Sequence, residues 1–139
     1  IGGNDLLQHL GLRRPTDKTL YDTPLGLVMY QLINTFKPYG FELTSPVFEH
    51  LNRNDLLQQE TLHDIRSGLI GKTAIHPEQI EHIEACYKVK QDDLTAAEAI
   101  LHDSAAAVFK MNDSMCEVAT HRVWANSIIK RHQVYGKIT

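Results

Sequence analysis

The sequence lacks the features that mark several special classes of protein. Among its 139 residues only Cys86 and Cys116 are cysteines, too few for a disulfide framework, and we expect free thiols in a reducing cytoplasm. The sequence contains no run of about 18 apolar residues, the length that a membrane-spanning helix needs. No signal peptide is visible at the start. The net charge is −3, so we expect no electrostatic attraction to nucleic acid or to a membrane surface.

Common catalytic signatures are also missing. The chain has no phosphate-binding loop, no dinucleotide-binding glycine fingerprint and no nucleophile elbow. Its composition, with 42% apolar and 22% charged residues, indicates a folded globular protein rather than a disordered one. The chain opens on Ile1 rather than Met, and residues 1–6 resemble a strand that runs into a loop. We therefore expect the C-terminal part of a longer protein.

Hydrophobic periodicity and capping residues predict helices that alternate with short strands up to residue 89. The expected order is a loop and short apolar stretch over 4–14 with an exposed polar connection over 13–17, a helix over 24–36 capped by Asp22 or Thr23, a strand over 41–45, a helix capped by Asn54 that ends at Gly68, a strand over 69–75, and a helix opened by Pro77 that runs to about residue 87.

The pattern changes after residue 89. We expect an alanine-rich helix capped by Asp92 or Asp93, an irregular stretch over 104–111, a last helix from about 117 to 132, and a frayed tail, with no strand between the two helices. Alternating strands and helices form parallel sheets, but two or three strands cannot close a barrel. The sequence therefore predicts an α/β fold: the C-terminal part of a (β/α)₈ TIM barrel over 1–89, with a helical extension over 90–139.

Three short segments carry side chains suited to chemistry. Asp5 follows an expected strand end and is flanked by glycines, which suits either a ligand of a hard divalent cation or a helix cap. Lys72 and His76 lie at a strand-to-helix junction, where each could contact substrate or serve packing and capping. Asp113 and Glu117 lie four residues apart before the last helix, as capping residues or as a carboxylate held over an active site.

These segments together resemble one family. Residues 68–80 match the Gly-x-x-Gly-Lys-x-x-Ile-His-Pro-x-Gln-Ile segment of citrate lyase β-subunit-like proteins, in the aldolase and citrate lyase family. Residues 2–6 resemble the family's Gly-x-x-Asp-Leu loop, and residues 115–117 resemble its Met-[Ile/Val]-Asp-x-Pro segment. Within the family, the chain is most similar to the carbon–carbon-bond lyase-like branch associated with tellurium-resistance gene clusters.

The resemblance implies a TIM barrel with a C-terminal helical extension and a Mg²⁺ site that Mn²⁺ can also fill. It implies cleavage or formation of a carbon–carbon bond, through a metal-stabilised enolate, on a small carboxylate or an acyl-coenzyme A thioester. The family's metal-binding Asp matches Asp5, and its metal-binding Glu and substrate-binding Arg are expected upstream of Ile1. Gly3, Asn4, Lys72 and His76 are expected to bind substrate.

The resemblance also assigns the acid or base. Glu117 matches the family's C-terminal Asp, and Asp113 takes its place if the register slips by four residues. Glu117 stands where the family has Asp, and Ala119 where it has Pro, so the reaction could be altered. In relatives this extension often reaches a neighbouring subunit, which implies a homo-oligomer. The alternative is a non-catalytic barrel relative that serves as a binding or assembly module.

Overall fold

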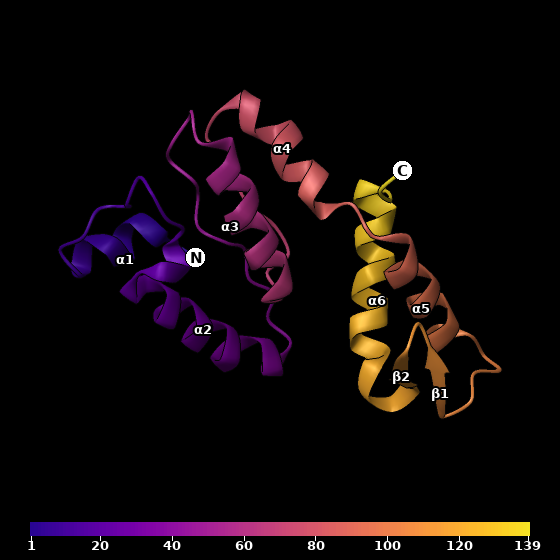
Figure 1. Cartoon of the computed structure of the whole chain (residues 1–139). Coiled ribbons are helices and arrows are strands. Elements are labelled where there is room, and N and C mark those ends of the chain that lie inside the picture. The colour runs from indigo at the N-terminus through magenta and orange to yellow at the C-terminus, as the bar shows by residue number, and fades with distance from the viewer. The chain divides into compact units, whose positions relative to one another are not determined.

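The computed structural model describes every residue from Ile1 to Thr139 and divides the chain into two compact units, 1–86 and 87–139 (Figure 1). The expected boundary lay at 89/90. The elements are α1 (Gly3–His9), a 3₁₀ turn (Leu20–Asp22), α2 (Pro24–Phe36), a 3₁₀ turn (Lys37–Tyr39), α3 (Asn54–Arg66), α4 (Pro77–Tyr87), α5 (Gln91–Leu101), β1 (Val108–Met111), β2 (Ser114–Glu117) and α6 (Val118–Tyr135). None of these helices has the length and apolar character needed to cross a membrane.

The helices of the first unit begin and end largely where their capping residues, prolines and glycines predict. Thr23 caps α2 by accepting a hydrogen bond from the backbone N–H of Leu25, and Pro24 is the first helical residue. Gly68 follows α3 with φ at +87°, as expected of the glycine after a helix end. Asn54, expected as a cap, is instead the first residue of α3, and Arg53 precedes it.

The expected loop over 4–14 is wrong, because residues 3–9 form α1. The expected strands over 41–45 and 69–75 are also reduced to one parallel bridge, between Ser45 and Lys72. Two backbone hydrogen bonds support it, from Ser45 N–H to the Gly71 carbonyl and from Ile70 N–H to the Leu43 carbonyl. The terminal amine of Ile1 donates to the Thr44 carbonyl at 2.8 Å. So few paired segments cannot sustain long strands, since each strand needs neighbours on a sheet.

The second unit contains a hairpin where an irregular stretch was expected. β1 and β2 pair antiparallel, with Met111 opposite Ser114, so residues 112 and 113 form a two-residue turn. Asn112 and Asp113 have φ of +50° and +59°. Positive φ at both central residues is what a type I′ hairpin turn requires, and Asn and Asp tolerate it. The expectation of no strand between the helices is therefore wrong, because the turn signal outweighed the weak periodicity.

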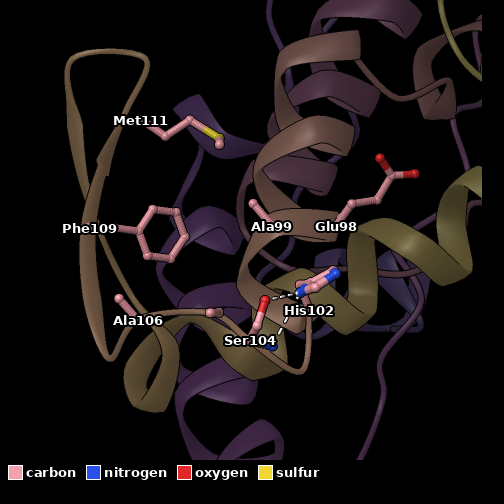
Figure 2. Close-up of a pocket in the computed structure, with 8 residues that line it drawn as sticks. Glu98, Ala99, His102, Ser104, Ala106, Phe109 and Met111 are labelled. Carbon is pink, nitrogen blue, oxygen red and sulfur yellow. Dashed lines mark hydrogen bonds between the residues drawn. The ribbon is translucent and has the colours of Figure 1, made fainter.

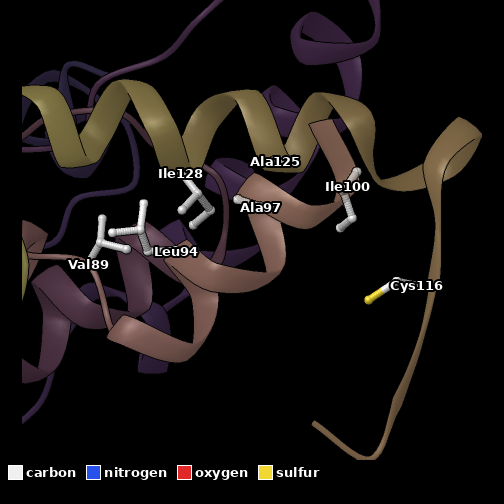
Figure 3. Close-up of a cluster of buried hydrophobic side chains, with 7 residues drawn as sticks. All are labelled: Val89, Leu94, Ala97, Ile100, Cys116, Ala125 and Ile128. Carbon is white, nitrogen blue, oxygen red and sulfur yellow. The ribbon is translucent and has the colours of Figure 1, made fainter. Parts of the chain in front are cut away.

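Two further expectations for the second unit are corrected. Lys90, rather than Asp92 or Asp93, precedes α5, and both aspartates lie in its first turn. The tail is not frayed, because Val89 exchanges backbone hydrogen bonds with Gly136 and Ile138. Figure 3 shows the apolar core of this unit, which is formed by Val89, before α5, and by residues of α5, β2 and α6: Leu94, Ala97, Ile100, Cys116, Ala125 and Ile128. The first unit has its own core of Leu7, Leu20, Leu25, Met29 and Leu69.

Candidate functional site

The first part of the candidate site lies at the start of α1. Gly3 is buried, and a Cβ there would approach the Cβ of Pro46 to 2.6 Å, so only glycine allows this close packing. Asn4 and Asp5 follow in the first turn and are exposed. The residue that precedes α1 is Gly2, so Asp5 is not the helix cap that its sequence context also allowed.

The second part lies beyond segment 70–72. His76 is partly exposed, and its Nδ1 accepts a hydrogen bond from the backbone N–H of Glu78, at the start of α4. Segments 43–45 and 70–72 run parallel, so residues 46–48 and 73–76 leave them at the same edge. Because Gly3 packs on Pro46, residues 3–5 belong to that edge too. We call residues 3–5, 46–48 and 73–76 the carboxyl edge.

Lys72 lies within the paired segment, and its side chain turns toward α3. Its Nζ donates to Glu60 Oε1 at 3.0 Å and to Asp64 Oδ2 at 2.9 Å, and all three side chains are almost fully buried. Glu60 also binds the guanidinium of Arg14 at 2.7 and 3.0 Å. Two cations thus face two carboxylates in a closed network, and the role of Lys72 in substrate binding stays a prediction.

The network changes the proton affinity of its members. Burial raises the pKa of Glu60, but the hydrogen bond from Arg14 and the charges of Lys72 and Arg14 outweigh it, so the pKa lies below its ordinary value. Burial raises the pKa of Asp64 despite the charge of Lys72. The Tyr21 hydroxyl donates to Asp64 at 2.6 Å, and burial together with that carboxylate raises the pKa of Tyr21 strongly.

Sequence reasoning missed this network. Residues 13–17 were expected to be an exposed connection, which is right for Arg13, Thr16 and Asp17 but wrong for Arg14, which is only 5% exposed. Glu60 and Asp64 are completely buried, one turn apart on α3. Their i, i+4 spacing beside apolar neighbours was the available signal. It could not identify the partners, because Arg14 lies 46 positions from Glu60 and Lys72 lies beyond the end of α3, on a segment whose path the helical pattern does not predict.

The predicted acid or base residues lie in the second unit. Asp113 occupies the hairpin turn, with its side chain 97% exposed and an ion pair to Lys110 at 3.1 Å. Glu117 ends β2, and its Oε2 accepts a hydrogen bond from the Thr120 hydroxyl. The backbone N–H of Glu117 donates to His121 Nδ1 at 3.0 Å, which fixes the start of α6. Glu117 is therefore the more constrained of the two carboxylates.

Two hollows open in the second unit. One, of about 460 Å³, is lined by Phe109, Met111 and the pair His102 and Ser104, whose side chains hydrogen-bond (Figure 2). The other, of about 480 Å³, lies by the hairpin and includes His121 and Trp124. None of the predicted site residues lines either hollow. The chain contains no group of three or more His, Cys, Asp or Glu side chains placed to hold a metal ion together.

Two solved structures share the fold. CitE from Mycobacterium tuberculosis, crystallised with magnesium, acetoacetate and coenzyme A, matches with a TM-score of 0.73 and 21% identity, over 95% of this chain and 50% of its own. A citrate lyase from Burkholderia xenovorans LB400 matches with a TM-score of 0.69 and 20% identity, over 99% of this chain and 46% of its own. This chain thus spans about half the length of either structure.

Sequence comparison identifies the family. A (3S)-malyl-CoA thioesterase from Cereibacter sphaeroides is 32% identical over 81 residues, which cover 58% of this chain and 27% of that protein. The family model described as a C–C bond lyase of the TIM-barrel fold matches residues 1–137. The fold expectation is confirmed at this level, as a largely helical part of the TIM-barrel fold. This chain therefore belongs to the C–C bond lyase family.

Proposed function

We propose that the protein carrying this chain is a Mg²⁺-dependent carbon–carbon bond lyase or aldolase that acts on a small carboxylate or an acyl-coenzyme A thioester. One observation carries the proposal. Residues 2–6, which resemble the family's Gly-x-x-Asp-Leu loop, include the start of α1 at the carboxyl edge, and TIM-barrel enzymes hold their active sites at that edge. The proposal includes a cytoplasmic location, in line with the free thiols of Cys86 and Cys116, and a homo-oligomer.

Asp5 fits the role of a Mg²⁺ ligand. Its carboxylate is exposed at the carboxyl edge, and Mg²⁺ prefers oxygen donors, often one or two carboxylates with several waters. When bound, Mg²⁺ would supply a Lewis acid that stabilises negative charge on substrate oxygens. The family that this chain belongs to is expected to use a Glu as a second metal ligand, so we expect a further carboxylate from outside this chain to share the ion with Asp5. Mn²⁺ has similar ligand preferences and is expected to substitute.

The remaining residues bind substrate and move a proton. Gly3 lets the start of α1 pack directly against Pro46, and its backbone is the group expected to contact substrate there. Asn4 and His76 offer polar groups at the same edge. Breaking a carbon–carbon bond next to a carbonyl leaves an electron pair on the departing carbon, which must be protonated. Glu117 is assigned that proton transfer because its backbone and carboxylate are both anchored, with Asp113 as the alternative.

The test is turnover by the full native polypeptide. We would incubate it with malyl-CoA and citryl-CoA, with Mg²⁺ or with EDTA, and follow product thioesters by mass spectrometry. Cleavage should require Mg²⁺ and should fall at least about 100-fold in Glu117→Gln and in Asp5→Asn. Asp17→Asn, an exposed aspartate outside the edge, is the matched control. Cleavage that is unaffected by EDTA and by Asp5→Asn would contradict the proposal.

A second candidate is a non-catalytic relative that serves as a binding or assembly module. This candidate is favoured by two differences from the family pattern, since Glu117 stands where the family has Asp and Ala119 where it has Pro. Complete absence of cleavage, together with unchanged binding of a CoA thioester in Glu117→Gln, would support this candidate over the lyase.

A further inference from the structure

Gln79 is the side chain that joins two parts of the carboxyl edge. It lies in the first turn of α4 and is only 3% exposed, although glutamine is usually found on protein surfaces. A buried amide needs hydrogen-bond partners for both its oxygen and its nitrogen. Its Oε1 accepts from the backbone N–H of Ile75 at 2.9 Å, and its Nε2 donates to the Phe48 carbonyl at 2.7 Å.

These two bonds connect backbone that follows two different segments. Ile75 follows segment 70–72, and Phe48 follows segment 43–45. The Gln79 backbone N–H also donates to the His76 carbonyl at 3.0 Å, so the turn that carries His76 is held from two sides. These partners fix the orientation of the Gln79 amide. If the amide were reversed, its NH₂ group would face the Ile75 N–H and its oxygen would face the Phe48 carbonyl, so neither hydrogen bond could form.

Arg14 contacts the same loop, residues 46–48, through the Val47 carbonyl and the Phe48 ring. Its Nη2 donates to the Val47 carbonyl at 2.8 Å, and its guanidinium lies 4.7 Å from the centre of the Phe48 ring. Glu60 binds Arg14 through both carboxylate oxygens. Residues 46–48 are thus fixed at two successive carbonyls, and Gly3 packs directly on Pro46. A displacement of this loop would therefore move the start of α1, with Asn4 and Asp5.

We propose that Gln79 is a positioning residue, which holds the carboxyl edge so that Asn4, Asp5 and His76 keep one fixed arrangement. It touches none of the reacting atoms and acts through the backbone of residues 46–48 and 73–76. Its effect on turnover rests on the proposed lyase function, whereas its effect on the edge does not. Displacements of about 1 Å in such arrangements can lower rates about 100-fold, so the role has catalytic consequences.

The variants separate the two bonds. Gln79→Leu removes both hydrogen bonds, to the Ile75 N–H and to the Phe48 carbonyl. Gln79→Glu keeps an acceptor for the Ile75 N–H but, when ionised, places a carboxylate oxygen next to the Phe48 carbonyl oxygen, where no hydrogen bond can form. Burial raises the pKa of a carboxyl group, and its protonated form offers one donor and one acceptor, like the amide. Thr61→Val is the matched control, because the buried Thr61 hydroxyl bonds only within α3, to the Leu57 carbonyl.

Amide hydrogen exchange in the full polypeptide, followed by mass spectrometry, tests the arrangement without any substrate. Relative to wild type at the same pH, Gln79→Leu should increase exchange at least about tenfold in 1–6, 46–50 and 73–76, and leave α2 unchanged. Gln79→Glu should show this increase at about pH 8, where its carboxyl group is ionised, and should approach wild type at about pH 5.5, where the buried carboxyl group is protonated. If Gln79→Leu fails to fold, the pH dependence of Gln79→Glu still tests the proposal.

An increase spread evenly over the first unit, as a general loss of stability would produce in Thr61→Val, would overturn the proposal. So would an increase confined to α4. With an active wild type, Gln79→Leu should lower kcat for malyl-CoA cleavage by about 10- to 100-fold, and lower pH should restore Gln79→Glu. If wild type cleaves nothing while the exchange pattern appears, the positioning role stands and the lyase proposal fails.

Discussion

The charged side chain of Lys72 is buried in the first unit, where it contacts carboxylates instead of solvent. Its ammonium is buried between Glu60 and Asp64, and Arg14 balances the remaining charge. The attraction within such a network is opposed by the cost of removing all four charges from water. The network therefore gives little net stability as a whole, but each member depends strongly on the others.

The first prediction at this scale concerns the loss of one partner. Lys72→Met should lower the free energy of unfolding by about 3–5 kcal/mol, because it leaves a buried carboxylate uncompensated. Lys110→Met is the matched control, since the Lys110–Asp113 pair is solvent-exposed and such pairs contribute about 0–1 kcal/mol. Urea unfolding measures both. Equal effects of the two changes would show that the buried network is not maintained in solution.

The second prediction concerns pH. Glu60 has a folded-state pKa below its ordinary 4.5, so the stability it contributes is present above that value and is lost as pH falls through the folded-state pKa. Asp64 has a raised folded-state pKa, so stability increases as pH falls through it. Between about pH 3 and pH 6, Glu60 makes the free energy of unfolding rise with pH and Asp64 makes it fall. The rise with pH should therefore be steeper in Asp64→Asn and flatter in Glu60→Gln than in wild type. Identical slopes in the variants and wild type would refute these assignments.

At the scale of elements, turns and short segments place the candidate groups. The β1–β2 turn holds Asp113 at positive φ, and the bridge between Ser45 and Lys72 sets the carboxyl edge. Neither feature needs a long strand. The hairpin turn therefore offers a local test of both conformation and function.

Asp113→Gly should raise the free energy of unfolding of the second unit by up to about 1 kcal/mol, because glycine adopts positive φ without strain. Asp113→Val should lower it by about 1–2 kcal/mol. The lost ion pair with Lys110 is exposed and contributes little. Thermal unfolding measures stability, and turnover of Asp113→Gly separates the two candidate acids. Full turnover is expected if Glu117 moves the proton.

At the scale of the whole molecule, two compact units carry different parts of the predicted chemistry. The first unit contains Gly3, Asn4, Asp5, Lys72 and His76, and the second contains Asp113 and Glu117. Ligand binding should therefore have different effects on the two units.

Mg²⁺ should stabilise the first unit through Asp5. At a concentration of about 100 times Kd, a site present only in the folded state adds about 2.7 kcal/mol to the free energy of unfolding. Hydrogen exchange in α1 should slow on Mg²⁺ addition and return on EDTA addition, while α5 is unaffected. Asp5→Asn should abolish the response and Asp17→Asn should keep it. A response that survives Asp5→Asn would place the ion elsewhere.

Local signals in the sequence determined most helices of this protein. Thr23 and Pro24 start α2, Gly68 ends α3, and Pro77 starts α4, because caps, prolines and glycines act on backbone within a few residues. The motif at 68–80 also identified the family, now shown by the match over residues 1–137. These inferences needed no knowledge of distant contacts.

Only the tertiary structure decided what the polar residues of the first unit do. Arg14 and Glu60 lie 46 positions apart in sequence, and Gln79 and Phe48 lie 31 apart. Partners at such separations are chosen by the packing of whole segments, which a local pattern does not encode. The same reason explains why the expected strands shortened to one bridge, since pairing depends on neighbours far along the chain.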